Sequence, residues 1–138
     1  KRRGKTRYNF WGVAPAGEPL RVAHEVAEEA FILAVALGDG GRAARASILA
    51  IFGLLRYGST AMAGTPEWRH WAERADRHSA AGTVERVYAD IALARALSQA
   101  GQHRQARTLL MGAFELARTL GRPDPLFWAA EQAKEVVS

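Results

Sequence analysis

Histidine and glutamate residues are the first candidates for chemistry in this sequence. His24 and Glu25 begin like the His-Glu-x-x-His helix of zinc proteases, in which two histidines four residues apart share one helix face. The residue four positions after His24 is Glu28, so the second histidine ligand is missing. We therefore interpret this stretch as a solvated acidic helix face and not as a metal site.

A second group consists of His70, Glu73 and His78, which lie on one predicted helix. Their spacing of three and then five residues turns His78 away from the face that the first two share, and a metal would need ligands from another helix. We interpret these three residues as part of a polar helix face in contact with solvent. The stretch "GDGGR" lacks the lysine and spacing of a phosphate-binding loop, and "YGST" lacks a nucleophile-elbow context. We expect no enzymatic activity, metal or cofactor.

Charge and composition limit the classes of partner. The net charge of +5 comes from five basic residues among the first seven, and the remaining chain has 14 basic and 14 acidic residues. Contact with nucleic acid is therefore expected, if at all, only through a basic, flexible arm over residues 1–17. The longest apolar stretches have eight residues, too few to span a membrane. Cysteine is absent, which fits a cytoplasmic location.

Apolar residues recur at helical spacing along most of the chain, and no segment alternates with period two. Thr65 and Pro66 are typical of a helix start, as are Asp124 and Pro125 near the end of the chain. The predicted fold class is all-α with about six helices, over residues 20–37, 42–57, 66–82, 84–100, 104–120 and 125–137.

The sequence repeats itself. "AFILAVALG" at residues 30–38 and "AFELARTLG" at residues 113–121 share six of nine positions. Glycines that end helices recur at Gly38, Gly82 and Gly121, a spacing of 44 and 39 residues that is typical of a solenoid of helical hairpins. Small residues let helices approach closely, so we expect four alanines to be buried at helix contacts: Ala30, Ala34, Ala106 and Ala113.

Residues 90–113 resemble a tetratricopeptide repeat. The positions that carry the likeness are Leu93, Ala94, Leu97, Gly101, Ala106, Leu110 and Ala113. The middle hairpin departs from the pattern, because Trp68 stands where the family has a small alanine. We assign residues 18–138 to one tetratricopeptide-like helical repeat domain. Residues 20–138, and residues 90–121 best, are also similar to the repeat region of large bacterial signalling ATPases and transcription activators of the maltose-regulator type. The resemblance implies a right-handed helical-hairpin solenoid that serves as the sensor or docking part of a bacterial regulatory protein.

The resemblance also implies a groove for a peptide or a partner protein. In that family the first helix of each hairpin lines the groove, and the corresponding residues here are Tyr88, Ile91, Arg95, Ser98 and Gln99, with Ser47, Leu54 and Tyr57 from the middle hairpin. The alternative is a regulatory domain that senses a small molecule in an enclosed pocket lined by Trp68, Trp71 and Tyr57, with the basic arm contacting a polyanion.

The two ends of the predicted solenoid give one further expectation. A solenoid needs polar end caps, yet the last predicted helix offers an apolar face. Its members are Leu126, Phe127, Ala130, Ala133, Val136 and Val137. A second copy of the chain could cover this face, so we predict a homo-oligomer that forms through a terminal helix.

Overall fold

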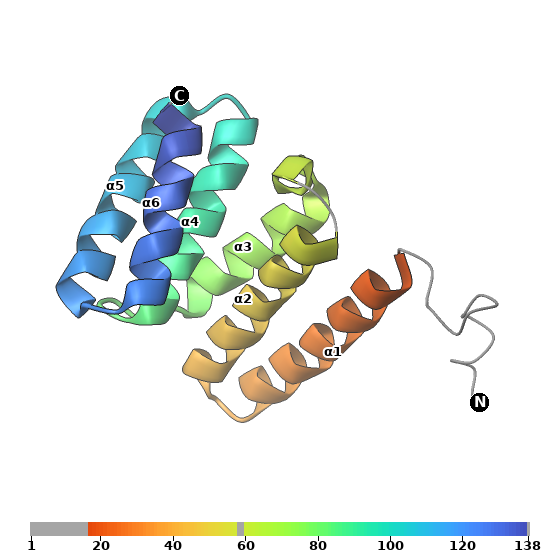
Figure 1. The fold of residues 1–138 in the computed structure, drawn as a ribbon. Coiled ribbons are helices and arrows are strands. Elements are labelled where there is room, and N and C mark those ends of the chain that lie inside the picture. The colour runs from red at the N-terminus through yellow and green to blue at the C-terminus, as the bar shows by residue number, and fades with distance from the viewer. Residues whose placement is uncertain (1–16, 58–59, 138) are drawn as a thin grey trace, which may run out of the picture.

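The computed structural model describes residues 17–57 and 60–137, and the predicted basic arm lies outside them except for Gly17. Six α-helices follow one another, with a short 3₁₀ helix between the second and third and no strand in these two stretches (Figure 1). The all-α prediction with about six helices is confirmed. The helices are α1 (Gly17–Ala36), α2 (Gly40–Tyr57), α3 (Pro66–His78), α4 (Val84–Gln99), α5 (His103–Leu120) and α6 (Pro123–Val137), and the 3₁₀ helix η2 spans Thr60–Gly64.

The helix ends follow local signals in the sequence. Gly38, Gly82 and Gly121 all adopt φ between +67° and +77°, a conformation that suits glycine. Gly38 and Gly121 adopt it directly after α1 and α5, where it ends the helix, whereas Gly82 lies in the turn before α4. The hydroxyl of Thr65 accepts a hydrogen bond from the backbone N–H of Trp68 at 3.2 Å and caps α3 as predicted.

Two predicted boundaries need correction. Helix α3 ends at His78, well before Gly82. Helix α6 begins at Pro123, so Asp124 lies in its first turn and does not precede the helix as a cap. Both Pro123 and Pro125 fit this turn, because the first backbone N–H groups of a helix have no partner within it.

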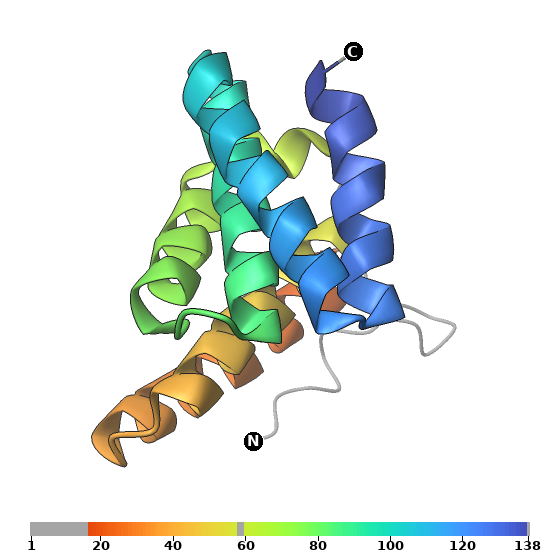
Figure 2. The ribbon, with the colours of Figure 1, turned by 90° about the vertical axis from the view of Figure 1, so that its left-hand side faces the viewer.

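The helices pack in an alternating pattern. Each helix contacts the next one along the chain, and in addition α2 contacts α4 and α4 contacts α6. We call α2, α4 and α6 the inner helices. Figure 2 shows α5 in front of α4, with α3 and α6 on either side of it. Helix α4 is therefore the central helix of the fold, with neighbours on most of its sides.

Three groups of buried residues form the core, and α4 contributes to all of them. One lies among α1 to α4 around two tryptophans, the second lies among α4, α5 and α6, and a small third group lies among α2, α3 and α4. Ala34, Ala106 and Ala113 are buried as predicted, with exposed fractions of 3% or less. Ala30 is exposed, which corrects the fourth alanine prediction. The buried face of α1 contains Ala27, Phe31 and Ala34. Ala30 lies about 100° away from Phe31 around the helix, outside this face.

Trp68 and Trp71 fill the space between hairpins. Both side chains have no exposed surface. The indole N–H of Trp68 donates to the backbone carbonyl of Ala92 in α4 at 2.8 Å, and that of Trp71 donates to His24 Nδ1 in α1 at 3.2 Å. Each tryptophan thus links α3 to another helix by both packing and a hydrogen bond, which accounts for the departure of this hairpin from the alanine pattern.

Candidate functional site on the inner helices

Three aromatic side chains from the three inner helices meet at one place. Phe52 of α2 lies edge-on to Tyr88 of α4, with ring centroids 5.4 Å apart. Trp128 of α6 lies 5.3 Å from Phe52 and 5.4 Å from Tyr88 by the same measure. All three side chains are half-buried. We call Phe52, Tyr88 and Trp128 the aromatic triad. Its members form a joint surface that remains partly open to solvent.

A pocket of about 260 Å³ lies beside the triad, between α2 and α4. We call it the α2–α4 pocket. Its wall is mostly apolar, and it shares Tyr88 with the triad. Leu49 in this wall is 65% exposed. The lining residues are Arg45, Ile48, Leu49, Val84, Glu85 and Tyr88.

An ion pair joins the two helices at this pocket. Nη1 of Arg45 in α2 lies 3.1 Å from Oε2 of Glu85 in α4. More than half of the Arg45 side chain is exposed, so water weakens the attraction, and the pair contributes little to stability. For a ligand, the pair places one positive and one negative side chain next to the apolar wall of the α2–α4 pocket.

The hydroxyl of Tyr88 is protonated well above neutral pH. Burial raises the pKa of this phenol, and the negative charge of Asp124 raises it further, while Arg122 acts in the opposite direction. A protonated hydroxyl both donates and accepts hydrogen bonds. Tyr88 can therefore present an aromatic ring and a hydrogen-bonding group to the same ligand.

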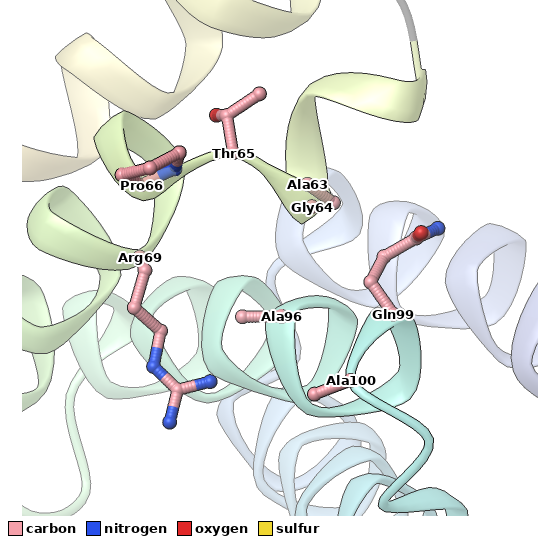
Figure 3. A pocket seen from close by; sticks show the side chains of 8 residues that line it. All are labelled: Ala63, Gly64, Thr65, Pro66, Arg69, Ala96, Gln99 and Ala100. Carbon is pink, nitrogen blue, oxygen red and sulfur yellow. The ribbon is translucent and has the colours of Figure 1, made fainter.

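A second pocket, of about 300 Å³, lies at the other end of α4 (Figure 3). We call it the α3–α4 pocket. Gln99 extends from α4 toward Gly64, and Arg69 extends from α3, where its Nε lies 3.0 Å from Oε2 of Glu73. The lining residues are Ala63, Gly64, Thr65, Pro66, Arg69, Ala96, Gln99 and Ala100.

The structure separates the residues that the resemblance places in one groove. Tyr88 belongs to the aromatic triad, and Gln99 lines the α3–α4 pocket. Ser98 is half-buried, with its hydroxyl 3.5 Å from His103 Nδ1. The side chain of Tyr57 is outside the described part of the chain.

The other four predicted groove residues are buried. Their exposed fractions are 0% for Ile91, 6% for Arg95, 2% for Leu54 and 0% for Ser47. A guanidinium N–H of Arg95 donates to the side-chain oxygen of Gln132 in α6. These four residues therefore do not face an open groove. For Ile91 and Arg95 the reason is the packing of α5 and α6 around α4, which a single repeat of sequence does not reveal.

Several residues of the site were not predicted from the sequence. They are Phe52, Trp128, Arg45, Leu49 and Glu85. One signal could have indicated the first two, because Phe52 and Trp128 lie 36 and 40 residues from Tyr88, close to the period of the hairpins. The two charged residues and Leu49 have no such signal, since exposed charged and apolar residues are common on any helix.

The histidines considered for metal binding have other surroundings. His24 accepts the hydrogen bond of Trp71, His78 packs edge-on against Phe31 with centroids 5.3 Å apart, and His70 is exposed. Among residues 17–57 and 60–137, no three histidine, cysteine, aspartate or glutamate side chains come together as metal ligands. In the same two stretches, no helix is long and apolar enough to cross a membrane.

Comparisons of the chain with protein-family models, with curated proteins and with solved structures find no match. The geometry of the site is therefore the basis for any functional conclusion.

Proposed function

We propose that this chain is a non-enzymatic binding scaffold that recognises a peptide or a partner protein through its inner helices. The proposed architecture is a short right-handed solenoid of helical hairpins, similar to tetratricopeptide repeats. Two observations support it. The inner helices contact one another in a row. The positions that carry the likeness pack in the core, except for Gly101 in the turn between α4 and α5. Leu93 is half-buried there, while Ala94, Ala106, Leu110 and Ala113 are buried.

The observation that carries the functional proposal is the aromatic triad beside the α2–α4 pocket. Phe52, Tyr88 and Trp128 are half-buried and lie within 5.4 Å of one another by ring centroids. Tyrosine and tryptophan are among the residues that most often dominate the binding energy of protein interfaces. An aromatic surface next to an apolar hollow, with Arg45 and Glu85 beside it, suits a peptide that inserts one apolar side chain.

The size of the pocket favours a side chain over a whole small molecule. Sites for drug-sized ligands usually enclose about 300–1,000 Å³. The α2–α4 pocket has about 260 Å³, below that range. The small-molecule alternative instead placed its ligand in an enclosed pocket lined by Trp68, Trp71 and Tyr57. The two indoles are themselves packed in the core with no exposed surface. The peptide-binding proposal is therefore the better supported one.

On this proposal the chain is the docking or sensing part of a bacterial regulatory protein that acts in the cytoplasm. The first experiment is a selection of peptides from a random displayed library against the full chain. The affinity of the selected peptides is then measured by fluorescence anisotropy for the unmodified chain and for two variants, Leu49→Asp and Met111→Asp. Leu49 lines the α2–α4 pocket, whereas Met111 lies on α5, an outer helix.

These two variants form a matched pair, because Leu49 is 65% exposed and Met111 is 53% exposed. Neither substitution should change the melting temperature much, since exposed positions away from special features tolerate replacement. We expect Leu49→Asp to raise the Kd by about tenfold or more, a loss of about 1.4 kcal/mol, and Met111→Asp to leave it unchanged. Failure to select any peptide, or selected peptides that bind both variants equally well, would refute the proposal.

A further inference from the structure

The outer side of α1 carries an apolar stripe that no described helix covers. Its five members recur every three or four residues and share one side of the helix and the turn after it. We call them the α1 stripe: Val22, Val26, Ala30, Leu33 and Leu37. Ala30 is exposed, and the exposed fractions of the other four run from 42% to 66%. Helix α1 lies at the edge of the fold (Figure 1). Large contiguous apolar surfaces are typical of interfaces.

The charges along α1 indicate what kind of surface would cover the stripe. The helix contains four glutamates and one basic residue, Arg21. Arg21 lies 2.5 Å from Glu25, and Arg74 of α3 lies 3.0 Å from Glu28. Glu25 and Glu29 are exposed along one edge of the stripe. Two copies of α1 packed antiparallel through the stripe would bring these acidic edges together, and like charges repel. A basic segment with apolar side chains would fit better.

The chain itself contains such a segment. Residues 1–7 include five lysines and arginines and no acidic residue, and Tyr8, Phe10 and Trp11 follow directly. We propose that residues 1–16 fold back along α1, so that the three aromatic side chains cover the α1 stripe and the basic residues lie next to Glu25 and Glu29. The occupant of the stripe is thus the amino-terminal segment of the same molecule, and its function is to shield α1.

The length of the segment permits this arrangement. Ala30 lies 13 residues after Gly17, about 20 Å along the helix at a rise of about 1.5 Å per residue. Asn9 lies eight residues before Gly17, and an extended chain of that length spans about 26 Å at about 3.3 Å per residue. The aromatic residues can therefore reach Val22 to Ala30, with the basic residues placed alongside or beyond Glu29.

Cysteine cross-linking tests the proposal directly, because the chain has no cysteine of its own. The full chain is prepared with Asn9→Cys and Ala30→Cys and oxidised at low concentration. A disulfide requires Cα atoms within about 7 Å, so it reports close approach. The control pairs Asn9→Cys with Ile32→Cys, an exposed position that is also within reach but turned about 200° around the helix from Ala30.

We expect the Ala30 pair to form a disulfide within one molecule at least about tenfold faster than the Ile32 pair, because a docked segment raises the effective concentration on one side of the helix. Glu25→Gln with Glu29→Gln should slow the reaction of the Ala30 pair. Equal rates for the two pairs would overturn the proposal. A disulfide that joins two molecules at the same dilution would also overturn it and would assign the stripe to a second copy.

Thermal melting of the full chain gives an independent readout. Leu33 and Ile32 are adjacent and similarly exposed, at 61% and 57%, but only Leu33 belongs to the stripe. Leu33→Asn should lower the melting temperature by several degrees, Ile32→Asn by less, and the difference should vanish when Phe10 and Trp11 are both serine. An equal effect of the two substitutions contradicts the proposal. Neither test involves the α2–α4 pocket, so its outcome is separate from the test of peptide binding.

Discussion

Replacing Trp68 by alanine should destabilise this fold strongly. The indole has no exposed surface and packs in the core among α1 to α4. Its N–H donates to the carbonyl of Ala92 at 2.8 Å, and the guanidinium of Arg95 lies 5.9 Å from the ring centroid. The spacing of α3 and α4 thus depends on the large side chain, and alanine would leave a cavity between them.

The expected magnitude follows from this burial. Truncation of a buried tryptophan to alanine costs about 3–5 kcal/mol, a large share of the about 5–15 kcal/mol that stabilise a typical domain. Because Trp68→Ala could leave the chain partly unfolded, Trp68→Phe provides a milder variant. It keeps a buried ring but loses the hydrogen bond and several apolar atoms, and we expect it to cost about 1–2.5 kcal/mol.

The measurement is urea unfolding followed by far-ultraviolet circular dichroism, which reports helix content in all variants. Glu67→Ala is the control, since Glu67 is the exposed neighbour of Trp68 in the same helix. It should change the free energy of unfolding by no more than about 0.5 kcal/mol. A cost of less than about 1 kcal/mol for Trp68→Ala would show that α3 and α4 close around the smaller residue, and the reasoning from burial would then fail.

Four further results are expected. Ala106 has no exposed surface, so Ala106→Leu should overpack the contact between α4 and α5 and cost about 1–3 kcal/mol in the free energy of unfolding. A methyl group on Gly112 would meet no other atom within 4 Å, so Gly112→Ala should stabilise α5 by about 0.5–1 kcal/mol. Arg95→Ala should lower stability by at least about 1.5 kcal/mol, because the side chain is 6% exposed and bonded to Gln132. In an alkaline absorbance titration, with Tyr88→Phe as the blank, the pKa of Tyr88 should lie above the ordinary tyrosine pKa of 10.0. Asp124→Asn should lower the pKa of Tyr88 but leave it above 10.0, because burial still raises it. Since the folded state holds this proton more tightly than the unfolded state, stability should decline as the pH rises from 10.0 through the pKa of folded Tyr88.

Sequence was sufficient for the features that depend on neighbouring residues. Glycine at Gly38 and Gly121 ends a helix because it adopts positive φ, and Thr65 caps α3 because its hydroxyl reaches the backbone N–H of Trp68. Helical spacing of apolar residues gave the number of helices and the burial of Ala34, Ala106 and Ala113. These signals act within a few residues, so one sequence contains all the information they need.

The candidate site could be predicted only in small part, because it depends on which faces of α4 its neighbours cover. The resemblance placed Tyr88, Ile91 and Arg95 together on an open face, but Tyr88 is half-buried and the other two are buried. Helix α6 contributes Gln132 to Arg95 and Trp128 to the triad, two contacts between residues far apart in the chain. Such contacts depend on the angle and register at which helices pack. A tryptophan at position 68 sets a different packing of α3 and α4 from the one that an alanine would allow.

The central position of α4 has a consequence for the kind of ligand that the scaffold can bind. From Ile91 to Arg95 its side chains are buried except for Leu93, which is half-buried. The two pockets lie at opposite ends of the helix, one at Val84 to Tyr88 and the other at Ala96 to Ala100. Tyr88 and Gln99 are about 16 Å apart along the axis, a distance that about five extended residues would span, but the middle of α4 is covered by packed side chains. A continuous groove along α4 is therefore interrupted here. We infer that the ligand of the α2–α4 pocket is a short segment, held by one inserted side chain and by contacts with the aromatic triad.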